Sequence, residues 1–234
     1  MAELITAAQA AQRLGVAPSR VRALIAHGTL TATMAGSQWL IDADSLDRHH
    51  DLMSAGATGR SFSPRIAWGA AALCDGRHEG LTPTERTRLR HRLANVGEGG
   101  TDVCAQVQRW LSRRAQSVHR YRVGERDLAE LLSSSGVMAT GISAIDAYSL
   151  GLATGGAADA YVSDRTRQKL VDDFVLIDSA RGNLTLRVTD ADVFDAAVAP
   201  RLIAGVDLTE DTDTRTRTAG CNLIGDALRA ARRP

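Results

Sequence analysis

The sequence predicts an α+β protein, and two changes of pattern along the chain support this expectation. The first fifty residues combine short amphipathic helices with a hairpin signal, and the stretch after them is helical and rich in arginine. From about residue 118, short apolar strands alternate with helices, which is typical of a mixed domain. We therefore expect four segments: 1–52, a linker at 53–62, a basic helical region at 63–117, and an α+β domain at 118–234.

The N-terminal segment begins with two predicted helices joined by a tight turn. A capping-box pattern at Thr6 starts the first helix, and Gly15 ends it. The second helix starts near Pro18, and its apolar residues recur at i, i+3, i+4 spacing, which turns them inward. The side chains that remain outside at its start are Ser19, Arg20 and Arg22.

A hairpin follows the second helix. Residues 29–34 and 38–41 are short apolar-polar alternations, and the small residues Ala35, Gly36 and Ser37 separate them as a turn. A third helix starts near Asp42. Two helices followed by such a hairpin are typical of a winged helix-turn-helix.

The first fifty residues resemble the excisionase-like and MerR-like branch of winged-helix DNA-binding domains. The resemblance rests on A-A-x-x-L-G-V in the first helix and turn, V-R-x-L-I-x-x-G-x-L in the second helix, and G-S-Q-W-L-I in the wing. It implies that Ser19, Arg20 and Arg22 contact bases or phosphates, because the start of that helix faces the major groove. It also implies that Ser37 and Gln38, at the wing tip, meet the DNA backbone or the minor groove.

Charge is unevenly placed along a chain whose formal net charge is only +1. Residues 1–50 hold four Arg and four acids, whereas residues 60–122 hold twelve Arg and five acids. The second stretch contains a helix that begins at a capping box at Thr82 and has only a narrow apolar seam. Its outer surface is either simply solvated or adds phosphate contacts. The candidate phosphate contacts are Arg86, Arg90 and Arg92.

The region from about residue 119 to the end resembles the C-terminal part of AbiEi-type antitoxins. The resemblance lies in the order of its elements, with the segments H-R-Y-R-V, M-A-T-G-I-S-A, D-A-Y-V-S and N-L-T-L-R-V before a last helix. Those antitoxins are transcriptional repressors encoded beside nucleotidyltransferase toxins. The resemblance implies a homodimer on double-stranded DNA, bound to inverted repeats in its own promoter, and a C-terminal domain that counteracts the toxin. The excisionase-like N-terminus departs from that family and leaves the operator architecture open.

Two local expectations within the last domain concern its secondary structure. Residues 142–152 are expected to form a helix. Residues 175–177 and 184–188 are expected to form two strands joined by a hairpin turn at 178–183.

Composition excludes several classes of protein. The cysteines Cys74, Cys104 and Cys221 are far apart, odd in number and without a C-x-x-C pair, so the sequence predicts neither a disulfide nor a zinc site and fits a reducing cytoplasm. No run is long enough for a membrane span, and the N-terminus lacks a signal pattern. We expect no cofactor and no bound metal.

The sequence offers no catalytic constellation. Asp172 and Asp173 are an acidic pair that could bind a metal, with Lys169, the only lysine, nearby. All three lie on one predicted helix, whereas a catalytic metal site of this kind takes its ligands from strands. Glu210, Asp211 and Asp213 precede the last helix, where acidic residues suit the helix dipole. We therefore expect a binding protein rather than an enzyme.

Two alternatives to a repressor remain open. The first is an antitoxin that acts mainly by direct binding to its toxin, through an exposed apolar seam on the last helix formed by Leu223, Ile224, Ala227 and Leu228. The second is an excisionase-type recombination factor, although such factors are usually far shorter than this chain.

Overall fold

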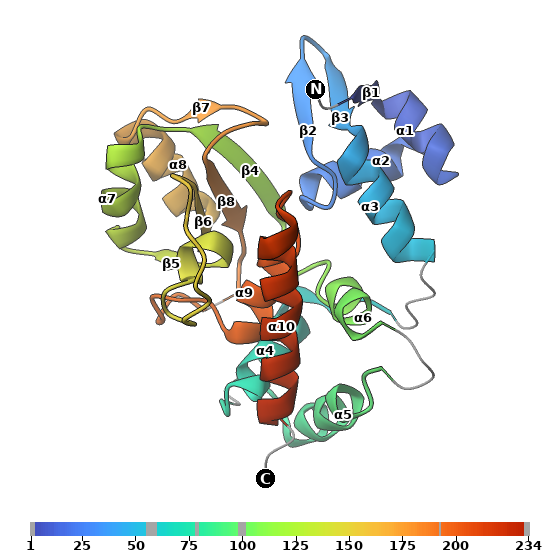
Figure 1. Ribbon diagram of the computed structural model, residues 1–234, viewed down its shortest axis with the longest axis vertical. Helices are drawn as coiled ribbons and strands as arrows, with labels where there is room; N and C mark the ends of the chain where they lie inside the picture. Colours follow the sequence, from blue (N-terminus) through green and yellow to red (C-terminus); the bar gives the residue numbers. More distant parts are fainter. Residues whose placement is uncertain (1–2, 55–59, 78–79, 98–101, 192, 232–234) are drawn as a thin grey trace.

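The computed structural model describes residues 3–54, 60–77, 80–97, 102–191 and 193–231. Figure 1 shows a winged helix and a five-stranded sheet side by side at one end of the long axis, with a layer of helices that continues to the other end. The predicted α+β class is confirmed. Residues 55–59 of the expected linker lie outside the described residues.

The winged helix forms from the local signals that predict it. Thr6 caps the first helix as a capping box, and Gly15 ends that helix in the left-handed conformation with φ 65°. A short first strand, which the sequence did not predict, pairs antiparallel with the second strand of the wing. The elements are β1 (Leu4–Thr6), α1 (Ala7–Leu14), α2 (Pro18–Ala26), β2 (Ala32–Ala35), β3 (Gln38–Asp42) and α3 (Ala43–Ser54).

The helical layer joins two distant parts of the chain around one core. Trp68 and Val107 from the basic region are buried in it together with Leu202 and Ile224 from the end of the chain. Phe62, placed in the linker by sequence, is also buried there. Residues 63–117 therefore share their core with the last helices. The elements are α4 (Pro64–Cys74), α5 (Pro83–Ala94), α6 (Val103–Trp110), α9 (Arg201–Leu208) and α10 (Thr214–Ala231).

The five-stranded sheet has the order β5-β6-β8-β4-β7, in which β6 and β8 are parallel and the other pairs are antiparallel. Its apolar core includes Leu131, Leu170 and Leu184. The elements are β4 (Ser117–Arg122), a 3-10 turn (Glu125–Asp127), α7 (Leu128–Ser133), β5 (Val137–Ala139), a 3-10 turn (Gly141–Ala144), β6 (Ala158–Val162), α8 (Asp164–Asp173), β7 (Ile177–Asp178) and β8 (Leu184–Val188).

Two secondary-structure expectations in this region are wrong. Residues 142–152 do not form an α-helix, since only a 3-10 turn forms and both Ser149 and Gly151 have positive φ angles, which interrupt a helix. The expected hairpin between β7 and β8 is also absent from the described sheet, because these strands lie on opposite sides of β4. Val175 has φ 49°, so the first of them starts only at Ile177.

The expectation that the cysteines form no disulfide is also wrong. Cys104 of α6 and Cys221 of α10 are joined by a disulfide with a Cα–Cα distance of 5.4 Å. They are 117 residues apart in sequence, and only the packing of the two helices brings them together. Cys74 is free and buried, and burial raises the pKa of its thiol to about 12.

The apolar seam of α10 is not available to a partner. Leu223, Ile224, Ala227 and Leu228 are at most 4% exposed, because they pack on the chain's own helices. The alternative in which this seam is an exposed docking surface is therefore contradicted.

A buried network of charges joins the sheet to the helical layer. Arg187 of β8 donates to Asp159 of β6 at 2.9 Å, and Arg114 donates to Asp207 of α9 at 2.8 Å. Glu210 bridges the two arginines, with each guanidinium donating to one of its oxygens at 2.6 Å. Pairing of this kind offsets the large cost of removing charges from water.

Glu210 and Asp213 therefore have different roles, although the sequence grouped them. Burial opposes ionisation of Glu210, but the charges of Arg114 and Arg187 outweigh it and lower the pKa of the carboxyl to about 2. Asp213 caps the start of α10, where its carboxylate accepts from the Thr216 amide at 2.7 Å. Of these two residues, Asp213 lies at the N-terminus of the last helix, as expected, and Glu210 belongs to the charge network instead.

Candidate nucleic-acid interface

Helix α2 has one buried face and one exposed face, as its spacing predicts. Val21, Leu24 and Ile25 are at most 8% exposed, and they pack in a core with Leu30 and Ile41. Pro18 occupies its first turn, where the missing N–H costs nothing. The exposed residues of that first turn and the one after it include Ser19, Arg20 and Arg22.

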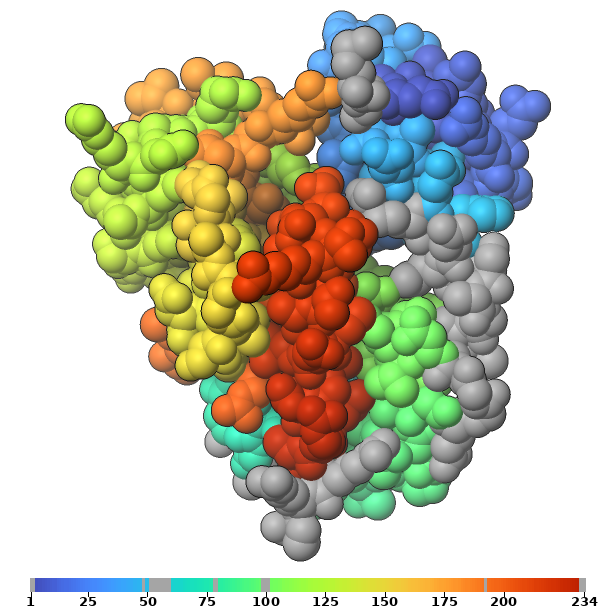
Figure 2. Space-filling model, viewed as in Figure 1, coloured from blue at the N-terminus to red at the C-terminus, as the bar shows by residue number. Residues whose placement is uncertain are grey.

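The wing lies beside this helix in the fold and is a hairpin, as predicted. β2 pairs antiparallel with β3, with Ala35 opposite Gln38, and Gly36 has φ 63° in the turn. Ser37 and Gln38 are exposed at the tip, and Trp39 packs inward against the winged-helix core. Figures 1 and 2 show the whole winged helix, in blue, as a lobe at one end of the molecule.

The positive charge of the exposed face comes from arginine rather than histidine. His49 of α3 is half-buried, and its pKa is lowered by burial and, to a smaller extent, by the charges of Arg20 and His50. The ring is therefore neutral at neutral pH.

The candidate phosphate contacts of α5 are not brought together with the residues of α2. Figure 1 places α5 at the end of the molecule opposite the winged helix. Arg90 is exposed there, whereas Arg86 is half-buried with its Nε atom lacking a hydrogen-bond partner among the described residues. One chain therefore does not present the arginines of α2 and α5 as a single surface.

Arg92 has a structural environment that the sequence did not reveal. Its guanidinium lies 4.5 Å from the ring centre of Phe62 and 4.6 Å from that of Trp110. It also donates to the backbone carbonyl of Arg60 at 2.9 Å. Burial lowers the pKa of Arg92. These contacts occupy the side chain within the fold, so its place differs from that expected of a phosphate contact.

Helix α2 contacts the sheet at a point that sequence analysis missed. Gly28, at the end of α2, has φ 69° and lies against Val118 of β4, where a Cβ would overlap the valine side chain. In the sequence this glycine appears only as the G of the V-R-x-L-I-x-x-G-x-L pattern. No local signal could have indicated its partner, which is ninety positions further along the chain.

Comparison with known proteins identifies this N-terminal part alone. Residues 4–49 match the family model of a helix-turn-helix domain, and the match covers α1, α2, the wing and the first half of α3. No curated protein and no solved structure matches the chain. Among the described helices, none combines the length and apolar character needed to cross a membrane. The domain match and the exposed start of α2 together indicate sequence-specific DNA binding.

Proposed function

We propose that this chain is a sequence-specific repressor of transcription that reads double-stranded DNA with α2. The observation that carries the proposal is the exposed row Ser19, Arg20 and Arg22 at the start of a helix whose other face is buried. An α-helix fits the major groove, and an arginine can donate two hydrogen bonds to a guanine. Ser37 and Gln38 contact the backbone or the minor groove from the wing.

The proposed contact surface is confined to the winged helix. Arg86 and Arg90 on α5 contact phosphates only where DNA also reaches the opposite end of the molecule. Arg92 contributes to stability through its aromatic neighbours. With four Arg and four acids in residues 1–50, the domain has little net charge for non-specific binding, so specificity rests on its few base contacts.

A finer proposal concerns the biological setting. The resemblance of the region after residue 119 to AbiEi-type antitoxins supports an antitoxin that binds inverted repeats in its own promoter as a homodimer. It also supports a nucleotidyltransferase-type toxin as the protein partner, a cytoplasmic location and a binding role without catalysis. Co-expression with the product of the neighbouring gene tests this setting: rescue of growth supports it, and unrelieved toxicity or a harmless neighbour contradicts it.

The DNA-binding proposal is tested by selection from a random duplex library with the full chain. We expect enrichment of one motif, arranged as an inverted repeat. A variant with Arg20→Ala and Arg22→Ala should lose the enrichment while it keeps the melting temperature of the wild type. An unenriched library, or the same motif selected by the double variant, contradicts the proposal.

A further inference from the structure

The edge strand β7 and the residues just before it carry the two most exposed large hydrophobic side chains among the described residues. Val175, two positions before the strand's first pair with β4, is 76% exposed, and Ile177 within the strand is 62% exposed. Natural proteins usually protect such an edge with charge, with proline or with a covering segment. Single exposed hydrophobic residues are common, but two of them beside an unpaired strand edge indicate a surface that another chain covers.

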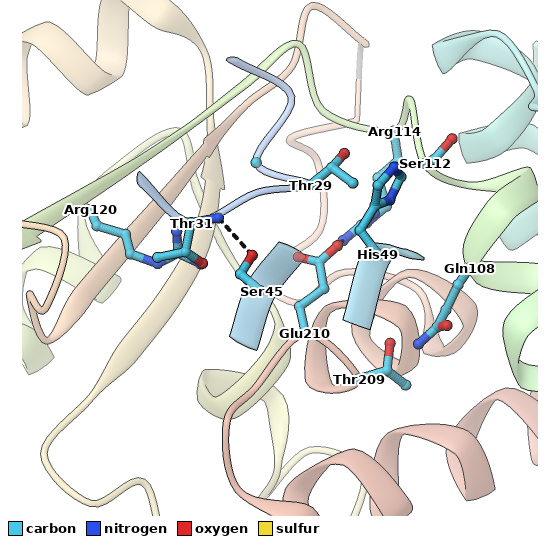
Figure 3. Close-up of a pocket in the computed structure, with 11 residues that line it drawn as sticks. Thr29, Thr31, Ser45, His49, Gln108, Ser112, Arg114, Arg120, Thr209 and Glu210 are labelled. Atoms are coloured by element: carbon cyan, nitrogen blue, oxygen red, sulfur yellow. Dashed lines mark hydrogen bonds and ion pairs between the residues drawn. The ribbon is translucent and has the colours of Figure 1, made fainter. Parts of the chain in front are cut away.

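The winged helix does not provide this cover. It contacts the beginning of β4, where Val118 packs against Gly28. Arg120 follows on the same strand and lines a polar cavity together with Thr29 of the winged helix (Figure 3). β7 pairs instead with the last two residues of β4. The cover by the winged helix therefore ends before β7, which agrees with the high exposure of Ile177.

The backbone at Val175 is strained, and burial within the chain does not compensate for the strain. Val175 follows the end of α8 with φ 49°, and the amide of Leu176 donates to the carbonyl of Val171 at 3.1 Å, which closes the helix. Glycine is the usual residue at such a helix end, and a β-branched residue there is an outlier. A valine that is both strained and exposed destabilises the isolated chain, so its presence points to a partner that buries the side chain.

The outer edge of β7 also has open backbone groups. The amide of Ser179 donates to the carbonyl of Arg120 at 3.0 Å. Because alternate residues of an antiparallel strand face the same neighbour, Ile177 also faces β4, whereas Asp178 faces outward. Leu176 lies on the same side as Asp178, and its carbonyl accepts no backbone hydrogen bond from the described residues. These outward groups are free to pair with a second strand.

We propose that β7 is a homodimer interface, in which the strand pairs antiparallel with β7 of a second copy of this chain about a two-fold axis at Ile177. The two-fold axis makes the two halves of the interface identical. It places the carbonyl of Leu176 beside the outward amide of Asp178 in the other copy, and the two Ile177 side chains in a close pair. An axis at Asp178 would instead set two carboxylates directly opposite each other, which is unfavourable.

Charges at the two ends of the strand favour a second copy as the partner. Asp173 and Arg181 are both exposed, and they lie at equal distances in sequence before and after Ile177. Neither charged side chain makes a hydrogen bond or an ion pair within the described part of the chain. Antiparallel pairing brings the end of β7 that carries Asp173 to the end of the other copy that carries Arg181, twice in each dimer. The edge is therefore complementary to itself.

This interface follows from the sheet edge and does not rest on the proposed DNA binding. A strand as short as β7 buries less surface than the roughly 1,200 Å² of a stable interface, so the dimer is weak and reversible.

Sedimentation equilibrium of the full chain without DNA, from micromolar to millimolar concentration, tests the interface. The average mass should rise with concentration from that of the 24.9 kDa chain towards twice that value. Ile177→Asp should weaken the association at least tenfold. Leu4→Asp is the matched control, since Leu4 is 49% exposed on β1, an edge strand of the other sheet, and it should associate as the wild type does. A wild type that stays monomeric, or equal association of Ile177→Asp and the wild type, would overturn the proposal.

Val175→Gly separates a role in the interface from a role in the fold. Glycine relieves the strain at this position, so the variant should melt at a higher temperature than the wild type when both are monomeric. Its dimer should nevertheless be at least threefold weaker, because the side chain that the partner buries is gone. A variant that is more stable and still associates as the wild type does would contradict the burial of Val175 by a second copy.

Charge reversal tests the two-fold arrangement itself. Asp173→Arg and Arg181→Asp should each weaken the dimer at least threefold at low salt, because like charges then meet across the axis. A chain with both changes should associate as the wild type does, since the exchanged charges again face each other. Melting curves of the three variants establish that each is folded. Failure of the double change to restore association would overturn the antiparallel pairing of β7 with a second copy.

Discussion

Gly28 at the end of α2 packs directly against Val118 of β4, with no room for a side chain between them. A Cβ at this position would overlap both the Cβ and the Cγ2 atoms of the valine. The glycine also has φ 69°, a conformation in which other residues are strained. A single residue thus ends α2 and sets the separation of this helix from the sheet.

Gly28→Ala is expected to lower the free energy of unfolding by about 2 to 4 kcal/mol, because overpacking adds to the backbone strain. Gly15→Ala is the matched control, since Gly15 has φ 65° but nothing lies within 4 Å of its Cβ position. That variant should lose only about 1 kcal/mol. Equal losses in urea denaturation would show that the contact with Val118 does not limit the packing.

Arg92 and Arg90 allow a direct comparison of two arginines on one helix. Arg92→Ala removes the contacts with Phe62 and Trp110 and the hydrogen bond to Arg60, and should cost about 1 to 2 kcal/mol of stability. Arg90 is exposed, so Arg90→Ala should change stability by less than about 0.5 kcal/mol. Chemical denaturation measures both, and equal stability of the two variants would contradict a structural role for Arg92.

The disulfide between Cys104 and Cys221 closes a long loop and should stabilise the fold. Cys104→Ser with Cys221→Ser is expected to lower the free energy of unfolding by about 2 to 4 kcal/mol. Dithiothreitol should destabilise the wild type by a similar amount and have no effect on the double variant. Alkylation of the unfolded, unreduced chain should label Cys74 alone; labelling of three cysteines would show that the bond does not form.

Glu210 gives the stability of the protein a distinct pH dependence. Its folded-state pKa of about 2 lies below the unfolded value of about 4.3, so ionised Glu210 stabilises the fold above the unfolded pKa. That contribution is lost as the pH falls towards 2. Glu210→Gln removes the carboxylate that accepts from both buried arginines and should cost about 3 kcal/mol at pH 7.

The difference between wild type and Glu210→Gln should shrink steadily between pH 5 and pH 2, because protonation of the wild-type carboxyl removes the same charge. Denaturation curves of both proteins at several pH values give this difference. A gap that stays constant over the acid range would show that Glu210 is not ionised in the folded state.

The parts of the fold that were predictable are those with local signals. The capping boxes at Thr6 and Thr82 mark the starts of α1 and α5, and the alternation at 184–188 marks β8. The two faces of α2 follow from helical spacing. In each case the residues that decide the structure lie within a few positions of one another.

The features that were missed depend on residues far apart in the sequence, or lie where the sequence has no hydrophobic periodicity. Helix α9 is buried on every side from Leu202 to Leu208, so it shows no polar face that would mark it as a helix. The disulfide, the Gly28 contact and the environment of Arg92 each join residues that only the tertiary fold brings together. Glu210 was misplaced for the same reason, since Arg114 and Arg187 are far away in sequence.

The central claim, that α2 reads DNA through its first turns, is tested most directly by Arg20→Ala against Arg165→Ala. Both changes remove one exposed arginine, but Arg165 lies on α8, away from the winged helix. We predict that Arg20→Ala weakens binding to the selected duplex by about 1 to 3 kcal/mol and relaxes the preference at one base pair, whereas Arg165→Ala binds as the wild type does. Equal affinity of the two variants for the selected duplex would contradict the account.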